Sequence, residues 1–163
     1  LAAPLLTSMV SSQEASTYGF YANVAIACIL SIVFLGKVGA DWMPPEPLSQ
    51  EQWMDTHYGK QVAASFSLVL LATLAGVAAG LLAFGKKQWK RAGVACIIAF
   101  VLTCLSFVWF IRHCNTTLVG EICLQLDFEW FHGMLIGSLI NFGFAAYNAY
   151  SVHGEAARLD LPK

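Results

Sequence analysis

The chain has 163 residues, of which 58% are hydrophobic and only 12% are charged, and its formal net charge is −1. Soluble domains carry about 25% charged residues, so this composition excludes an ordinary water-soluble domain. No basic stripe of the kind that binds nucleic acid occurs, which argues against a nucleic-acid partner.

Four long apolar runs predict transmembrane helices. A bilayer core of about 30 Å accepts roughly 20 apolar residues per helix, and a helix satisfies its own backbone hydrogen bonds within lipid. The first run is the shortest and contains Asn23. We therefore expect an all-α integral membrane protein, an up-down four-helix transmembrane bundle in a single domain 1–163. The predicted spans are residues 19–35, 62–84, 92–111 and 131–150.

The loop between the first two runs, about residues 37–61, has features of a membrane-surface segment. Three prolines within four residues favour a stiff, extended strut. Ser49 then resembles a helix N-cap, with Gln52 in the capping-box position. These features predict a short interfacial helix at residues 50–58 in this first outer loop. A partner-binding loop is the alternative interpretation.

The short loop between the second and third runs carries four of the nine basic residues, Lys86, Lys87, Lys90 and Arg91. Because positive charge is retained on the inner side of a membrane, we expect this loop and both termini on the cytosolic, matrix or stromal side. The cluster is predicted to contact anionic lipid headgroups, each charge contributing about 1 kcal/mol. Contact with a partner protein is the second interpretation.

The predicted topology divides the charge unequally. The inner side has a net charge of +3 and the outer side −4. An acidic outer face is typical of a solvated loop surface, although it could attract a basic partner. An amino end on the inner side fits removal of a matrix or stromal presequence, or simple trimming of a cytosolic tail, better than removal of a secretory signal. We therefore favour an organelle inner membrane, with the plasma membrane as the alternative.

Two sets of small residues at helical spacing predict close helix contacts. Ala72, Gly76 and Gly80 share one stripe of the second run, and Gly133 and Gly137 share one of the fourth. Small residues at this spacing let helix backbones approach closely. The contact could be internal or with another chain.

The second outer loop contains Cys114 and Cys123, nine positions apart. Both lie on the side that is the more oxidising one in secretory and some organellar settings, so a disulfide between them is predicted. Asn115 begins a glycosylation sequence. It lies so near the membrane that we interpret it as a chance match.

Three histidines, His57, His113 and His132, fall at the outer ends of the second, third and fourth runs. They are weak candidates for a metal or haem site. No histidine pair has ligand spacing along a helix, and the bilayer interior holds no second histidine layer. We therefore predict no metal and no cofactor, and expect only bound lipid.

Ser138, Asn141 and Asn148 lie near one face of the fourth run. They could join helices by hydrogen bonds or line a polar pathway. No run has a charged residue at its centre, where transporters usually carry one, so packing is favoured. The many aromatic residues at the outer ends could also line a site for lipid, quinone or pigment.

The helix-contact residues, the uncharged span centres and the lack of a catalytic motif predict a non-catalytic accessory subunit of a larger membrane complex. The favoured setting is an energy-transducing complex, of the respiratory-chain type, in the mitochondrion inner membrane. Its partners would be other membrane subunits, bound through helix contacts, and lipid. The alternatives are a cell-surface tetraspan for adhesion or channel regulation, and a membrane redox protein carrying haem or a metal.

Overall fold

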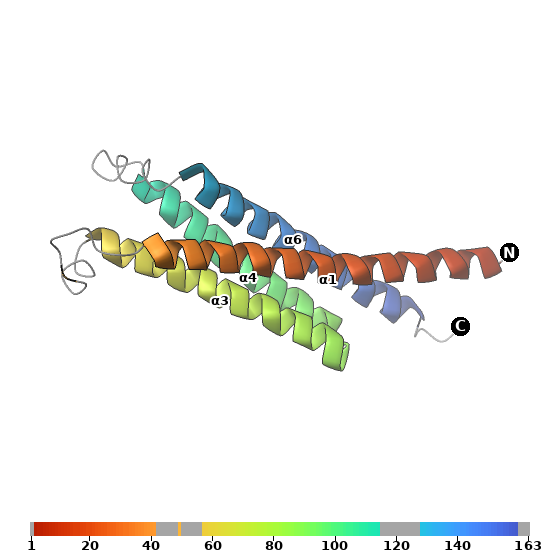
Figure 1. The fold of residues 1–163 in the computed structure, drawn as a ribbon. Coiled ribbons are helices and arrows are strands. Elements are labelled where there is room, and N and C mark those ends of the chain that lie inside the picture. The colour runs from red at the N-terminus through yellow and green to blue at the C-terminus, as the bar shows by residue number, and fades with distance from the viewer. Residues whose placement is uncertain (1, 42–48, 50–56, 115–127, 160–163) are drawn as a thin grey trace.

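The computed structural model of the chain contains four helices in sequence (Figure 1). The structure describes residues 2–41, 49, 57–114 and 128–159, and among these the side chains of residues 12–38, 49, 63–85, 87–109 and 132–157. All regular secondary structure within the described ranges is helical. The helices are α1 (Ala2–Asp41), α3 (His57–Lys86), α4 (Trp89–Cys114) and α6 (Phe128–Leu159).

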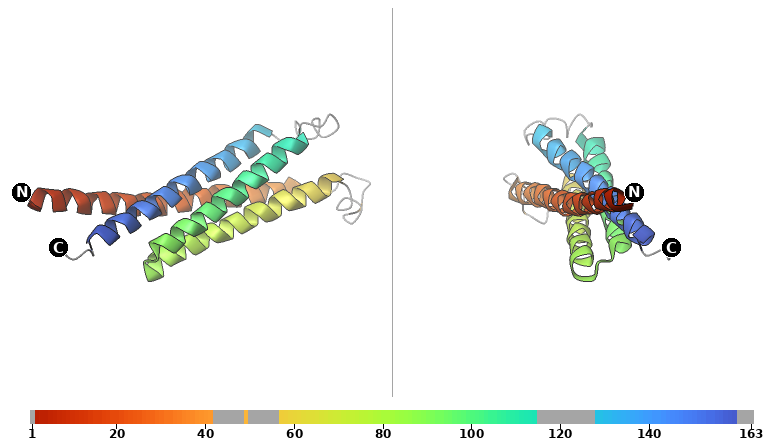
Figure 2. Two further views of the ribbon diagram at one scale, coloured as in Figure 1. Left: turned by 180° about the vertical axis from the view of Figure 1, so that it is seen from behind. Right: turned by 90° about the vertical axis from the view of Figure 1, so that its right-hand side faces the viewer.

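Consecutive helices run in opposite directions, which gives the bundle its up-down topology (Figures 1 and 2). Helix α1 packs mainly against α6, and α3 packs mainly against α4, while α4 also lies along α6. The first turn of α1 and the last turn of α6 lie at the end of the bundle where α3 turns into α4 (Figure 1). We call this end, marked by residues 86–89, the hairpin end.

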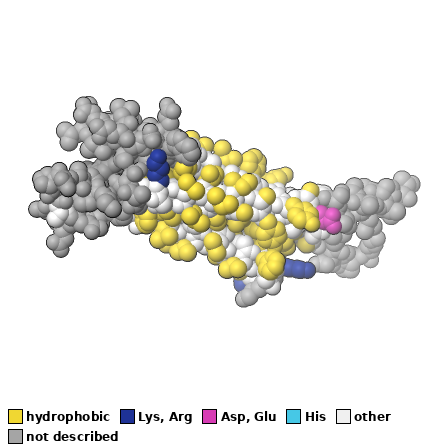
Figure 3. All heavy atoms as spheres, in the orientation of Figure 1, with side chains coloured by type: hydrophobic (Ala, Val, Ile, Leu, Met, Phe, Trp, Pro, Cys, Tyr) yellow, Lys and Arg dark blue, Asp and Glu magenta, His cyan; other side chains and the backbone are white. Residues whose placement is uncertain are grey.

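Three helices are long and apolar enough to cross a membrane, which makes this a membrane protein. Their spans are Ser12–Val38 in α1, Ala63–Gly85 in α3 and Trp89–Trp109 in α4. Large apolar side chains point outward along them, including Leu81, which is 67% exposed, and Phe84, which is 81% exposed. Figure 3 shows these hydrophobic side chains covering the middle of the bundle. Such a surface is stable in lipid and not in water.

The described part of α6 does not reach the same hydropathy, although this helix is as long as its neighbours. Its polar residues, among them Asn141 and Asn148, lower the average. The prediction of an all-helical membrane bundle is therefore confirmed, with three apolar helices. A fourth crossing at residues 131–150 stays a prediction.

Helix α1 is much longer than the predicted first span, residues 19–35. It contains 40 residues and begins at Ala2. Polar residues such as Ser12 and Glu14 mark the end of an apolar run, but they do not stop a helix. Pro4 lies in the first turn, where a missing N–H breaks no helical hydrogen bond. The amino-terminal part of α1 consequently projects beyond α3 and α4 at the hairpin end (Figures 1 and 2). Residues 50–56 of the predicted interfacial helix lie outside the described residues.

Small side chains form most of the interior of the bundle. Alanines from all four helices are buried, and three phenylalanines fill the remaining space without exposure. Because alanine adds little to the helix radius, the backbones can approach closely, and van der Waals contact then holds the helices together. The buried phenylalanines are Phe20, Phe34 and Phe142.

Among the described glycines, Gly76 of α3 has the least room for a side chain. A Cβ atom at this position would lie 2.6 Å from Phe142 Cε1 of α6 and 3.0 Å from Cys28 Sγ of α1. The same atom at Gly80 would meet only Val24, at 3.9 Å. Ala72, one turn before Gly76, is fully buried. The stripe that these small residues form therefore faces the inside of this bundle.

The two glycines of the α6 stripe have different surroundings. A Cβ atom at Gly137 would lie 2.8 Å from Leu30 Cδ1 of α1, whereas one at Gly133 would have nothing within 4 Å. Gly137 therefore faces α1, and Gly133 faces open space on the outside of the bundle.

Buried hydroxyl groups pair across the helix interfaces. Ser31 of α1 donates to Ser138 Oγ of α6 at 3.2 Å, and Ser138 donates to the Ala27 carbonyl at 3.3 Å. Ser65 of α3 and Ser106 of α4 share a bond of 2.6 Å. A hydroxyl group inside a bilayer needs such a partner because it has no water to bond. Ser138 is thus used for packing against α1.

The contact at Gly76 can be tested with two alanine substitutions. Gly76→Ala should lower the free energy of unfolding relative to Gly80→Ala by about 1–3 kcal/mol, the usual range for overpacking. Both changes gain the same helix propensity, so the difference isolates the clash with Phe142. Reversible unfolding in mixed micelles measures it. Equal stability of the two variants would contradict the contact.

Candidate functional site

A hollow of about 380 Å³ opens at the hairpin end of the bundle. Such a volume lies within the range of about 300–1,000 Å³ that small ligands occupy. Three of its lining side chains carry a permanent positive charge, and none of those described is acidic. We call this feature the basic hollow; its lining residues are Lys87, Gln88, Trp89, Lys90, Arg91 and His153.

The turn between α3 and α4 forms one wall of the basic hollow. The Gln88 N–H donates to the Leu82 carbonyl at 3.0 Å, and the Ala92 N–H donates to the Gln88 carbonyl at 2.9 Å. Between the two helices, Lys87 has a φ of 47°. This left-handed conformation costs an L-residue about 1–2 kcal/mol and costs glycine almost nothing. A lysine is therefore present where the backbone alone would favour glycine.

Trp89, the first residue of α4, is held by an aromatic cluster on α1. Its ring meets Phe20 edge to face at a centroid distance of 5.4 Å, and Tyr21 at 6.1 Å. Phe20 and Tyr21 meet each other at 5.3 Å. Each aromatic pair of this kind adds about 0.5–1.5 kcal/mol beyond the area that it buries. The start of α4, and with it the floor of the basic hollow, is thereby fixed against α1.

Helix α6 forms the opposite wall. Tyr150 packs so closely on α4 that a Cβ atom at Gly93 would lie 3.0 Å from its Cε2 atom. His153 follows Tyr150 by three residues, on the same side of the helix, and so reaches the hollow. Farther along, Ser12 of α1 donates to Glu155 Oε1 at 2.9 Å. The basic hollow is thus lined by the turn that follows α3, by the start of α4 and by α6.

The positive side chains are exposed, and one of them has a positioning partner. Arg91 Nη1 donates to Gln88 Oε1 at 3.1 Å, which orients the guanidinium group at the edge of the hollow. Lys87 and Lys90 lie free of any ion pair that the described residues show. Three of the four residues predicted to contact lipid headgroups therefore lie together at the basic hollow. The side chain of Lys86, the fourth, lies outside the described residues.

His153 is the lining residue that sequence reasoning did not connect with the basic loop. Its place at the same end of the bundle follows from the up-down order of the four helices alone. Its position against Trp89 and Lys90 depends on the register of α6 on α4, which the Tyr150–Gly93 contact sets. The sequence signal for this register is Gly93, a small residue one turn into α4. A glycine indicates close packing but does not indicate which side chain packs against it.

The outer histidines lie at the other end of the bundle. The His132 ring packs edge to face on Phe107 at 5.5 Å. The side chains of His57 and His113 lie outside the described residues. Among the residues searched, which are the described ones, no group of three or more histidine, cysteine or acidic side chains is placed to hold a metal.

The cysteines fall into two sets. The three with described side chains, Cys28, Cys96 and Cys104, are free thiols inside the helices. The predicted disulfide between Cys114 and Cys123 falls on side chains outside the described residues. Cys114 is the last residue of α4, but its side chain, like all of Cys123, lies outside the described residues, as does Asn115.

Comparison with known proteins gives this chain no relative. No protein-family model matches it, and neither the curated proteins nor the solved structures gave a match. Any statement about its function therefore depends on the geometry described above.

Proposed function

We propose that the chain is a four-span membrane protein that serves as a non-catalytic accessory subunit of a larger membrane complex. The observation that carries this proposal is the contrast between a close-packed interior and an apolar exterior. The Phe142 ring of α6 fills the space beside Gly76 of α3, and buried alanines surround this contact. The outward apolar side chains on all four helices remain to contact lipid and other subunits.

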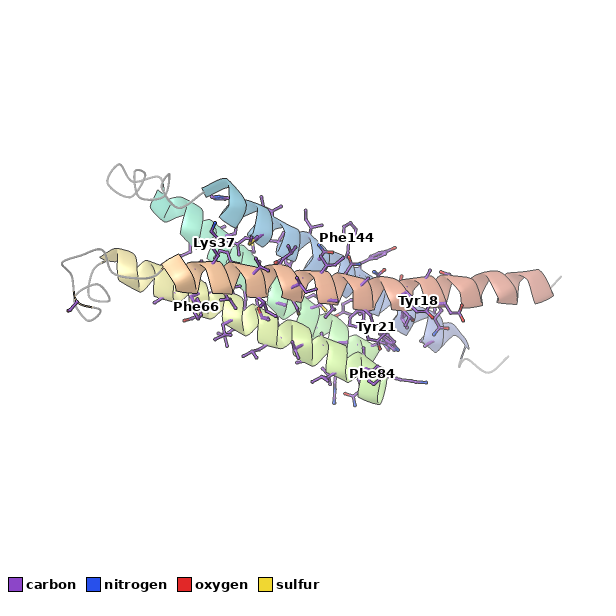
Figure 4. All side chains as sticks on the ribbon, in the orientation of Figure 1. Tyr18, Tyr21, Lys37, Phe66, Phe84 and Phe144 are labelled. Atoms are coloured by element: carbon purple, nitrogen blue, oxygen red, sulfur yellow. The ribbon has the colours of Figure 1, made fainter. Side chains whose placement is uncertain are left out.

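A fourth crossing is supported by matching boundaries at both ends of the helices. In α1, the exposed Tyr18 and the outer Lys37 are separated by roughly 28 Å at 1.5 Å per residue. In α6, His132 and Tyr150 are separated by roughly the same distance, and the α4 span Trp89–Trp109 is similar. All agree with a hydrocarbon layer of about 30 Å. Figure 4 shows Tyr18 toward the hairpin end and Lys37 toward the other.

Two polar residues of α6, Asn141 and Ser138, have hydrogen-bond partners, which supports this crossing. Asn141 Nδ2 donates to the Gly137 carbonyl of its own helix at 2.8 Å. Ser138 bonds to α1, and Asn148 packs against Gly19 of the same helix. A helix of intermediate hydropathy can cross a bilayer when its neighbours pair its polar groups.

The outward face of α6 is the surface that best fits a protein partner. Gly133, Ile140, Phe144 and Tyr147 are exposed along one stripe of this helix. Gly133 leaves open space in which another helix could approach closely. Tyr147 adds a hydroxyl group that lipid tails could not bond. We therefore propose this stripe as the contact with another membrane subunit.

The type of complex is proposed from charge. The basic hairpin turn and both termini lie at one end, and positive-inside places that end in the matrix, stroma or cytosol. We propose an energy-transducing complex of an organelle inner membrane, such as the mitochondrial respiratory chain. A cell-surface tetraspan is the competing function. Enzymatic deglycosylation distinguishes the two, because a mobility shift at Asn115 would require a secretory route.

The fourth crossing can be tested by labelling introduced cysteines. Gly85→Cys and Gly154→Cys both put the new side chain into open space, so neither should disturb packing. If α6 crosses, a membrane-impermeant maleimide should modify both positions from the same side of sealed vesicles. The unsubstituted chain supplies the background. Labelling of the two positions from opposite sides would contradict the fourth crossing.

The subunit proposal can be tested by gentle solubilisation combined with photo-crosslinking. With a photoreactive phenylalanine at position 144, the chain should crosslink to a discrete protein, because this position lies on the proposed partner stripe. The matched control is the same group at position 81 of α3, which is 67% exposed and should crosslink mainly to lipid. A stable monomer that forms no protein crosslink at position 144 would contradict the proposal.

A further inference from the structure

We propose that the basic hollow is a binding site for a phosphate group that carries two negative charges, a phosphomonoester on a lipid headgroup or a free phosphate anion. The hollow brings together Lys87, Lys90 and Arg91 with His153. It lies at the ends of the spans Ala63–Gly85 and Trp89–Trp109, which is the level of lipid headgroups. The site is complete within one chain, so it does not depend on the proposed partner complex.

Positive charge is unbalanced among the described lining residues of the basic hollow. Three permanent cations line one hollow, and none of its described lining residues is acidic. The nearest acid along α6, Glu155, is not a lining residue; its Oε1 accepts a hydrogen bond from Ser12 of α1, and its buried Oε2 has no hydrogen-bond partner among the described residues. Like charges held close together repel one another, so this arrangement is stabilised when an anion enters. A phosphomonoester suits it because its charge and oxygens can meet several donors at once.

Lys87 has a left-handed backbone conformation. Its positive φ is unfavourable for lysine and easy for glycine. Strained residues of this kind cluster at binding sites, where the side chain has a role that the backbone does not favour. At position 87 the lysine side chain reaches the basic hollow. Anion binding accounts for a lysine at this position.

Contacts within the chain fix the walls of the basic hollow before a ligand arrives. Gln88 orients the Arg91 guanidinium group through a bond of 3.1 Å. Trp89 is held by Phe20 at 5.4 Å. Guanidinium groups bind phosphate oxygens in pairs, whereas lysine acts as a point charge.

His153 adds a donor from a different helix. Even the neutral imidazole ring keeps one N–H group, which can donate to a phosphate oxygen. Since this residue comes from α6 and the others from the α3–α4 turn and the start of α4, a bound phosphate would bridge the two. The ligand would therefore also tie the helix hairpin to α6.

The test uses the purified full-length chain in phosphatidylcholine nanodiscs that contain a small fraction of either phosphatidic acid or phosphatidylserine. Native mass spectrometry counts the retained lipid, and titration calorimetry in detergent measures binding of inorganic phosphate. We expect preferential retention of phosphatidic acid, whose headgroup is a phosphomonoester. Loss of one lysine should weaken it about fivefold, the usual effect of one charge at a membrane surface.

Lys87→Gly separates binding from folding. It should weaken phosphatidic acid binding while leaving the melting temperature unchanged or higher, because glycine relieves the left-handed backbone. Lys90→Gln should weaken binding to a similar degree. Lys37→Gln, which removes one charge at the opposite end, is the matched control and should have no effect.

The two sources of phosphate give different results. Binding of phosphatidic acid without measurable binding of inorganic phosphate identifies a lipid site, and saturable phosphate binding that Lys87→Gly weakens identifies a site for the free anion. Equal retention of phosphatidylserine and phosphatidic acid, or equal effects of Lys87→Gly and Lys37→Gln, would overturn the proposal.

Discussion

The contact of Gly76 with Phe142 and Cys28 is the constraint on which the rest of this bundle depends. It joins three helices at one point, because Gly76 belongs to α3, Phe142 to α6 and Cys28 to α1. In lipid no hydrophobic force drives helices together, so such close van der Waals contact has to hold them. The surrounding alanines continue the close contact toward both ends. Paired serine hydroxyls satisfy the polar groups that this approach buries.

The same packing produces the basic hollow. Because α6 lies so close to α4, Tyr150 covers Gly93, and His153 is carried to the turn between α3 and α4. Because α1 lies beside the start of α4, Phe20 and Tyr21 hold Trp89 in place. Lys87, Lys90 and Arg91 consequently line one side of the basic hollow, and His153 lines the other. A close-packed interior and the basic hollow at the hairpin end thus follow from one set of helix contacts.

Much of this fold was predictable from local patterns. Long apolar runs identify three spans, because insertion into lipid depends on the composition of each run. The spacing of Ala72, Gly76 and Gly80 marked a contact stripe, although only the structure shows that it faces inward. The length of α1 was not predictable from hydropathy, since polar residues continue a helix after the apolar run ends. The place of His153 was also not predictable, because it depends on the register between two helices distant in sequence.

The close-packed interior is tested most directly by a disulfide across it. The Cβ position of Gly76 lies 3.0 Å from Cys28 Sγ, which is short enough for a new thiol to reach that sulfur. In membranes under mild oxidation, Gly76→Cys combined with Phe142→Leu, which removes the ring atom 2.6 Å from this Cβ position, should therefore form a bond to Cys28, detected as a linked peptide by mass spectrometry. Gly80→Cys, whose Cβ position meets only Val24 at 3.9 Å, should not form this bond. Failure of Gly76→Cys to link to Cys28, or equal linkage of both variants, would contradict the account.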